Sequence, residues 1–172
     1  QLSQVLLNKP ILSIRTGGEV AVALVPIINP NNLKIEGWHC QDLHSKAPLI
    51  LQAGEVRDII GKGIVVNDHE SLTEPGEIIR LQEVIKINFE LMGKPVVGVS
   101  KQRLGKVTDY AIDMNTLYVQ KLYVSQPLLK SFTGGSLIID RNQIVEITNR
   151  KIIVQDPLQG VGADLPAAIP VG

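Results

Sequence analysis

The sequence repeats itself at a spacing of 84 to 88 residues, and this repeat limits the folds that the chain can adopt. Residues 8–14 match residues 93–99, and each stretch carries a Lys-Pro pair before a run of apolar residues. Residues 28–35 match residues 112–119, and both read as strand, polar turn and strand. The chain therefore contains two copies of one structural unit.

The match continues through the second part of each unit at a spacing of 88 residues. Three apolar stretches correspond there: residues 49–51 with 137–139, 56–59 with 144–147, and 64–66 with 152–154. The change of spacing falls in one connection, which spans residues 41–47 in the first unit and is longer, residues 125–135, in the second. Loops at a protein surface tolerate insertions of this kind.

Each unit reads as five or six short strands separated by turn signals, which is typical of small sandwiches or barrels. Apolar residues make up 44% of the chain but aromatic residues only 3%, so the core must consist of Ile, Val and Leu. Ile and Val favour strands. Residues 77–89 are compatible with a helix, and we expect a short helical turn there that continues into the link. The sequence predicts an all-β fold of two tandem small barrels packed through this apolar link.

The repeat divides the chain into three parts. We expect the first barrel and the link in residues 1–86, the second barrel in residues 87–158, and a tail in residues 159–172. The tail is rich in Gly and Pro and carries a single charge, so we expect it to be flexible or extended. It either ends the protein or leads into a further region.

Charge and composition exclude several classes of protein. The 17 basic residues are balanced by 17 acidic ones, so DNA is not an expected partner. No apolar run reaches the roughly 20 residues of a membrane span, and the first residues do not resemble a signal peptide. The single cysteine requires neither a disulfide nor a zinc fold, so we expect a cytoplasmic protein without direct membrane insertion.

The second unit resembles the PRC-barrel family. The resemblance rests on the opening of residues 93–97, the Leu-Gly-Lys-Val phrase of residues 104–107 leading into a strand, and the closing strand of residues 144–147. The first unit departs from this pattern: it has Asn8 in place of the opening Gly, and residues 19–22 where the Leu-Gly-Lys-Val phrase is expected. This barrel module is shared by the photosynthetic reaction centre H subunit and the ribosome maturation factor RimM. The resemblance implies an assembly and docking module without a catalytic motif to carry over.

Candidate ligands for a metal are densest in residues 39–44, which contain His39, Cys40, Asp42 and His44. Trp38 and Cys40, however, align with apolar positions of the other unit, so we expect both side chains to be buried. His39 would then point to the opposite face of the strand, which is poor geometry for a thiol nucleophile or a metal site. We therefore expect no catalytic, metal or cofactor site.

The acidic residues also have structural roles in this interpretation. We expect Asp68, Asp113 and Asp140 at turns, and Glu55, Asp58 and Glu146 on exposed faces.

Two other features point to partners. One turn of the second unit carries a cluster of cations: Lys94, Lys101, Arg103 and Lys106. They form either an RNA contact or a solvated rim, and the absence of an aromatic residue among them favours the rim. Leu128, Leu129 and Phe132 lie in the longer connection and form either a cap on the barrel or an exposed docking patch.

These observations favour a non-enzymatic assembly module. We expect it to bind another protein, or itself, through a loop end or the surface near the junction of the two barrels. A ribosome-associated or RNA-contacting accessory factor is the second hypothesis, which the resemblance favours and the neutral charge opposes. A cytoplasmic subunit that docks on a membrane complex is the third, and it would need an anchor from outside this chain.

Overall fold

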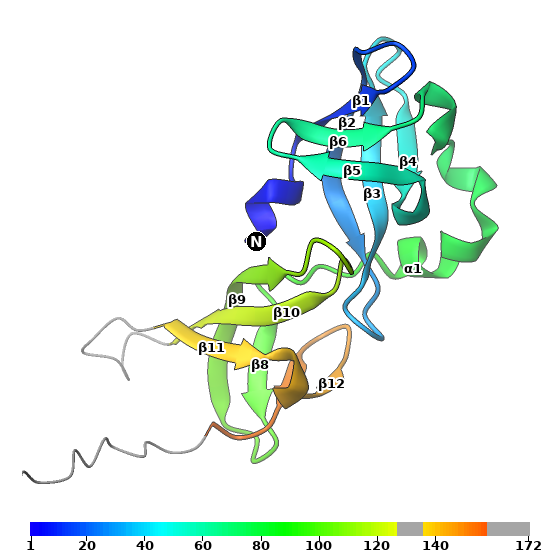
Figure 1. The fold of residues 1–172 in the computed structure, drawn as a ribbon. Helices are drawn as coiled ribbons and strands as arrows, with labels where there is room; N and C mark the ends of the chain where they lie inside the picture. Colours follow the sequence, from blue (N-terminus) through cyan, green and yellow to red (C-terminus); the bar gives the residue numbers. More distant parts are fainter. Residues whose placement is uncertain (127–135, 158–172) are drawn as a thin grey trace, which may run out of the picture.

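The computed structural model describes residues 1–126 and 136–157, which form two curled β-sheets, one in each half of the chain (Figure 1). The strands of the first sheet are β1 (Lys9–Ser13), β2 (Glu19–Ile28), β3 (Ile35–Asp42), β4 (Pro48–Gln52), β5 (Val56–Ile60), β6 (Gly63–Val66) and β7 (Leu72–Thr73). The strands of the second sheet are β8 (Pro95–Gly98), β9 (Arg103–Ile112), β10 (Val119–Ser125), β11 (Ser136–Asp140), β12 (Ile144–Ile147) and β13 (Ile152–Val154). The predicted all-β fold of two barrel-like units is confirmed.

The two sheets have the same strand order, as the sequence repeat predicts. The first runs β5-β6-β1-β2-β3-β4-β7 and the second runs β12-β13-β8-β9-β10-β11. In each sheet the opening strand pairs in parallel with the last strand that both units share, β1 with β6 and β8 with β13. Strand β7 extends the first sheet beyond β4. The parallel pair joins strands that are far apart in the sequence and curls each unit.

The strand register corrects the sequence alignment of the second strand by one residue. Pro10 lies opposite Val22 and Pro95 lies opposite Lys106, so Val22 and Lys106 correspond. Residues 20–23 therefore take the place of the Leu-Gly-Lys-Val phrase, one residue later than predicted. Residues 20–23 alternate Val and Ala and contain no glycine that would fix the alignment in the sequence. In the structure, β1–β2 and β8–β9 have a β-bulge at the same step, which identifies the corresponding residues.

The link between the sheets contains the predicted short helical turn. It consists of η4 (Pro75–Glu77), η5 (Ile79–Leu81) and α1 (Gln82–Ile87). Ile78 and Leu81 are buried in a small cluster with Ile27 and Ile50 of the first sheet. The remaining short helices are η1 (Ser3–Leu6), η2 (Ala53–Glu55), η3 (His69–Ser71) and η6 (Arg141–Gln143). Among the described residues, no helix is long and apolar enough to cross a membrane.

The two sheets meet through matching turns, the β2–β3 turn of the first and the β9–β10 turn of the second. The backbone N–H of Ile35 donates to the carbonyl of Leu117 at 2.9 Å, and the N–H of Val119 donates to the carbonyl of Leu33 at 3.0 Å. Leu33 and Leu117 both have left-handed backbone conformations, with φ of 55° and 59°. Because each turn gives one bond and receives one, the two units meet as the halves of a symmetric dimer would.

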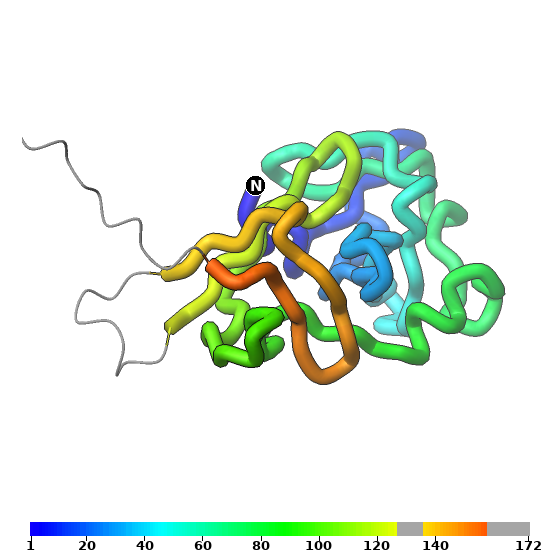
Figure 2. The backbone as a smooth tube through the Cα atoms, turned by 90° about the horizontal axis from the view of Figure 1, so that it is seen from below, coloured from blue at the N-terminus to red at the C-terminus, as the bar shows by residue number. Residues whose placement is uncertain are grey.

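The first residues of the chain also cross the junction. The amino group of Gln1 donates to the carbonyl of Ile112 at 2.8 Å, and the hydroxyl of Ser3 donates to Asp109 Oδ1 at 2.6 Å. The N-terminal segment accordingly lies beside β9 when the chain is seen from below (Figure 2). The N-terminus is thus held by the second unit although it precedes the first.

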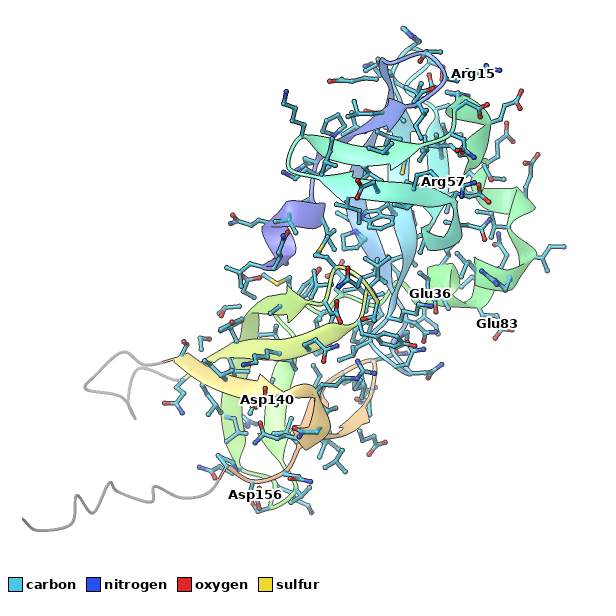
Figure 3. The ribbon with its side chains drawn as sticks, in the orientation of Figure 1. Arg15, Glu36, Arg57, Glu83, Asp140 and Asp156 are labelled. Atoms are coloured by element: carbon cyan, nitrogen blue, oxygen red, sulfur yellow. The ribbon has the colours of Figure 1, made fainter. Side chains whose placement is uncertain are left out.

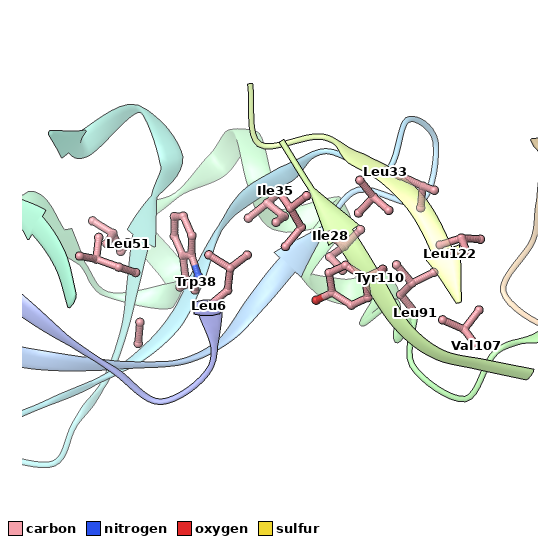
Figure 4. Packing of buried hydrophobic residues seen from close by; sticks show 14 of the residues in the cluster. Leu6, Ile28, Leu33, Ile35, Trp38, Leu51, Leu91, Val107, Tyr110 and Leu122 are labelled. Carbon is pink, nitrogen blue, oxygen red and sulfur yellow. The ribbon is translucent and has the colours of Figure 1, made fainter. Parts of the chain in front are cut away.

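A single hydrophobic cluster runs through both units. It extends from Leu51 and Trp38 in the first sheet, through Ile35, to Tyr110 and Leu122 in the second (Figure 4). Leu91, from the link, belongs to the same cluster. The two barrels therefore share buried surface, as the apolar link predicts.

Arg141 is expected to stabilise this junction. Its Nη1 donates to the carbonyl of Val119 at 3.0 Å, its Nη2 donates to the carbonyl of Asn32 in the first unit, and its guanidinium lies 4.8 Å from the centre of the Tyr118 ring. Because two charged hydrogen bonds and the ring contact are lost together, Arg141→Ala should lower the free energy of unfolding by about 2 kcal/mol. Urea unfolding measures this change. Arg57→Ala, which removes an exposed arginine of the first sheet, is the control; equal losses for the two variants would contradict a role at the junction.

Candidate functional site

The dense set of candidate ligands in residues 39–44 has structural roles. The Cys40 side chain is buried, its Sγ lies 3.4 Å from the carbonyl oxygen of Trp38, and burial raises the pKa of the thiol to about 12. His39 faces away from it, and partial burial lowers the pKa of its imidazole. Such a thiol stays protonated and is a poor nucleophile. Within residues 1–126 and 136–157, no three His, Cys, Asp or Glu side chains converge as metal ligands would.

Asp42, in the same stretch, fixes the turn between β3 and β4. Its Oδ1 accepts hydrogen bonds from the backbone N–H groups of His44 (2.9 Å) and Ser45 (2.7 Å), and its Oδ2 lies 2.6 Å from Nε2 of His69. The hydrogen bond with the His69 ring, followed by that with Ser45, holds the pKa of the Asp42 carboxyl well below its usual range. Asp42 thus ties the β3–β4 turn to η3, the helix that precedes β7.

A depressed pKa at Asp42 makes part of the stability depend on pH. An unfolded Asp has a pKa of about 3.9, so the carboxylate contributes its full stabilisation well above that pH and loses it as the pH falls toward the folded-state pKa. Asp42→Asn should therefore be less stable than the wild type at pH 6, with a smaller difference at pH 3. Urea unfolding at both pH values measures this. Asp58→Asn, at an exposed carboxylate, should change stability less, and a pH-independent loss in Asp42→Asn would contradict the prediction.

The remaining acidic residues lie where the sequence predicts them. Asp68 and Asp113 each accept a hydrogen bond from the backbone N–H two residues later, at 3.0 and 2.9 Å, and Asp140 forms a capping box with Gln143. The Asn115 N–H at that turn is the main cause that lowers the pKa of Asp113. The three acids predicted on exposed faces, Glu55, Asp58 and Glu146, are exposed. All of these carboxylates lie at turns or in solvent.

The structure brings together three of the four cations of the predicted basic cluster. Lys101, Arg103 and Lys106 line one groove on the outer face of the second sheet. Lys94 is not among the described residues of this groove; its Nζ donates to the carbonyl of Asn149 at 2.8 Å and lies 4.7 Å from the centre of the Phe89 ring. The candidate binding site is therefore the groove, not the single turn around which the sequence places the four cations.

The groove lies along strand β8, which has β9 on one side and β13 on the other. Side chains alternate across the sheet: Val96 and Ile152 are buried in the barrel, whereas Val97 and Ile153 face outward into the groove. Its volume is about 920 Å³. The described residues that line it are Pro95, Val96, Val97, Gly98, Val99, Lys101, Arg103, Gly105, Lys106, Ser125, Gln126, Arg150, Lys151 and Ile153. Its floor is thus aliphatic and its sides are cationic.

Two of the groove cations, Arg150 and Lys151, are absent from the sequence prediction. They lie in the turn between β12 and β13, far along the chain from Lys106, and the parallel pairing of β13 with β8 places them there. The repeat aligns residues 152–154 with residues 64–66, but it does not show that either strand lies beside the opening strand of its unit, so no sequence signal placed these two cations in the groove. The groove is therefore lined by five cations, of which the sequence predicts three.

The described lining of the groove contains no acidic and no aromatic residue. Asp156, which Figure 3 shows at the end of the second barrel, accepts hydrogen bonds from the backbone N–H (3.2 Å) and hydroxyl (2.9 Å) of Ser100. Its carboxylate thus holds the turn that follows β8. An anionic partner would meet an uncompensated set of cations along the described walls of the groove.

A second hollow lies near the junction, where the sequence also predicts a docking surface. This cleft has a volume of about 320 Å³ and lies between β2, α1 and the start of the second unit. Val25, Pro26, Phe89 and Met92 line it together with Tyr110, whose pKa is raised to about 12 by burial and, to a lesser extent, by the charge of Asp109. The cleft is apolar and has few charged groups, in contrast to the groove.

The predicted patch of Leu128, Leu129 and Phe132 lies outside the described residues, as does the tail from residue 159 onward. Gln126, the last described residue before this patch, lines the groove. The role of the patch stays a prediction.

These observations define an all-β protein of two packed barrel-like units with a basic groove on one of them. Comparison with models of protein families finds no match, and comparison with curated proteins finds none either. The function is therefore inferred from the groove itself.

Proposed function

We propose that this chain is a non-enzymatic docking protein, built of two PRC-type barrels, that holds a partner protein in the basic groove of the second barrel. The observation that carries the proposal is the convergence of five cations, from β9 and from the turns before β9 and β13, on one aliphatic floor. Fixed positive charge of this kind speeds the association of an anionic partner and fixes its orientation. The cytoplasm is the compartment that we assign within this proposal.

The first barrel supports this reading, because it has the same strand arrangement and lacks three of the corresponding charges, with Lys62 as the counterpart of Arg150. The register makes Glu19 the counterpart of Arg103 and Val22 the counterpart of Lys106. Gly63 corresponds to Lys151 in the same way. The fold therefore does not need the cations at these positions, and their clustering in the second barrel calls for a functional reason.

RNA is the second candidate occupant, and the same five cations favour it. Proteins that bind single strands usually add aromatic side chains on which bases stack, each contributing about 1–3 kcal/mol. The described groove offers aliphatic side chains instead. Apolar side chains of a polypeptide fit such a floor better than bases do, so we favour a protein partner.

Capture from a lysate of the host tests the function. The tagged full chain and a variant with Lys101, Arg103 and Lys106 changed to Ala are compared at low and moderate salt, with bound proteins and RNA both identified. We expect a specific protein that the wild type retains and the variant loses. Equal recovery with both chains would contradict the groove as the site, and salt-sensitive recovery of ribosomal RNA would support the second candidate.

The same capture experiment also tests the predicted patch in the connection after Gln126. Replacing Leu128, Leu129 and Phe132 together by Ala should weaken capture without loss of folding if the patch docks the partner. Loss of folding instead would identify these side chains as a cap on the barrel.

A further inference from the structure

The arrangement of floor and cations in the groove indicates the chemistry of its occupant. Pro95 and Val97 lie two residues apart in β8, where side chains on one face repeat about every 6.5 to 7 Å, and Val99 follows in the turn after the strand. An extended polypeptide places its own alternate side chains at the same spacing. A strand-like segment laid along β8 would therefore set a row of apolar side chains against the floor.

Cations flank this floor on both sides because β8 lies between β9 and β13. Arg103 and Lys106 belong to β9, and Arg150 and Lys151 precede β13 on the other side. All four side chains are exposed, as is Lys101 in the turn after β8. A segment on the floor would thus have positive charge along both of its edges.

We propose that the groove binds an extended segment of a partner protein in which carboxylates alternate with aliphatic side chains. The aliphatic side chains rest on the β8 floor, and the carboxylates, which alternate with them and point away from the floor, pair with the long Arg and Lys side chains of β9 and of the β12–β13 turn at the edges of the segment. This inference rests on the proposed docking function and adds the chemical class of the partner. The groove volume of about 920 Å³ lies at the upper end of the range of small-ligand pockets, roughly 300–1,000 Å³, which suits a peptide segment.

Fluorescence anisotropy with defined peptides tests the inference on the full chain. The probe is a short labelled peptide that alternates Glu with Val, and the controls are a Lys–Val peptide, a Glu–Ser peptide and an oligouridylate of equal length. We expect the Glu–Val peptide to bind at least about tenfold more tightly than each control, and more weakly as salt increases. The Glu–Ser peptide tests the floor, and the Lys–Val peptide tests the charge.

The repeat supplies variants that copy residues of the first barrel. Arg103→Glu and Lys106→Val each place in the second barrel the residue that the first barrel carries, and each should weaken the Glu–Val peptide about tenfold or more. Lys62→Glu is the matched control, since Lys62 is the exposed counterpart of Arg150 in the first barrel and should leave binding unchanged. Circular dichroism verifies the fold of each variant.

Several outcomes would overturn the inference. Tighter binding of the oligouridylate would assign the groove to RNA, and a dimer that Arg103→Glu dissociates in sedimentation would assign it to a second copy of the chain. If the Glu–Val peptide does not bind while a captured host protein still depends on the groove cations, the inferred chemistry fails and the docking function stands. If neither result depends on the cations, both fail.

Discussion

Replacing Trp38 by Ala is expected to lower the free energy of unfolding by about 3 kcal/mol. Trp38 is fully buried in β3, where it is the largest of the fully buried side chains. Truncation of such a residue usually costs about 3–5 kcal/mol, because the lost contacts and the cavity add. The expected value lies at the lower end because the indole Nε1 is buried without a hydrogen-bond partner among residues 1–126 and 136–157, and its removal returns part of that cost.

A matched substitution separates these two contributions. Trp38→Phe keeps a large aromatic ring and removes the unpartnered donor, so its free energy of unfolding should lie within about 1 kcal/mol of the wild type. Urea unfolding followed by far-ultraviolet circular dichroism suits all three proteins, since the variants lack the single tryptophan. A loss in Trp38→Phe as large as that in Trp38→Ala would contradict the inference that the unpartnered indole N–H is costly in the folded state.

The strand plan of this protein is predictable from sequence because the repeat supplies an internal alignment. A run such as residues 64–66 is ambiguous alone, but its match to residues 152–154 identifies both as the last strand that the two units share. Turn chemistry adds to this, since Asp113 and its neighbours form the predicted turn. The predicted alignment of residues 20–23 was wrong by one residue because Val and Ala are both small and apolar, so the sequence does not show which of them faces the barrel interior.

The junction is not predictable in the same way, because it depends on two turns that meet in space. Nothing in the sequence shows that Ile35 donates to Leu117 or that Gln1 reaches Ile112. The groove is an intermediate case. Lys101, Arg103 and Lys106 are close in sequence and visible as a cluster, whereas Arg150 and Lys151 join them through a parallel strand pair that only the fold creates.

The comparison of the barrels also separates framework from surface. Positions that face the barrel interior keep their character, as with Ile11 and Val96, or Ile64 and Ile152. Positions on the outer face vary more: Glu19 corresponds to Arg103 and Val22 to Lys106, whereas Lys62 and Arg150 keep the same charge. A barrel of this design can therefore carry a binding surface on its outer face at little cost to its core.

Gly105 lines the groove and also packs against the backbone of the adjacent strand β10, and Gly105→Ala is expected to destabilise the protein strongly. Its φ of +143° lies in the region that favours glycine, and a Cβ there would overlap the backbone carbonyl oxygen of Ser125 on the adjacent strand. Backbone atoms cannot rotate away as a side chain can, so β9 and β10 would have to separate. Overpacking and backbone strain together should lower the free energy of unfolding by about 3 kcal/mol or more.

The first barrel again offers the control, because the register makes Ala21 the counterpart of Gly105. Ala21 is fully buried, so its Cβ is accommodated in the first barrel, and Ala21→Gly should cost only about 1 kcal/mol through backbone entropy and one lost methyl group. Gly54→Ala, where a Cβ would meet open space, should change stability little. A Gly105→Ala protein as stable as Gly54→Ala would contradict the close approach of β9 and β10. The expected large loss would explain why this one position of the Leu-Gly-Lys-Val phrase requires glycine in the second barrel and tolerates Ala in the first.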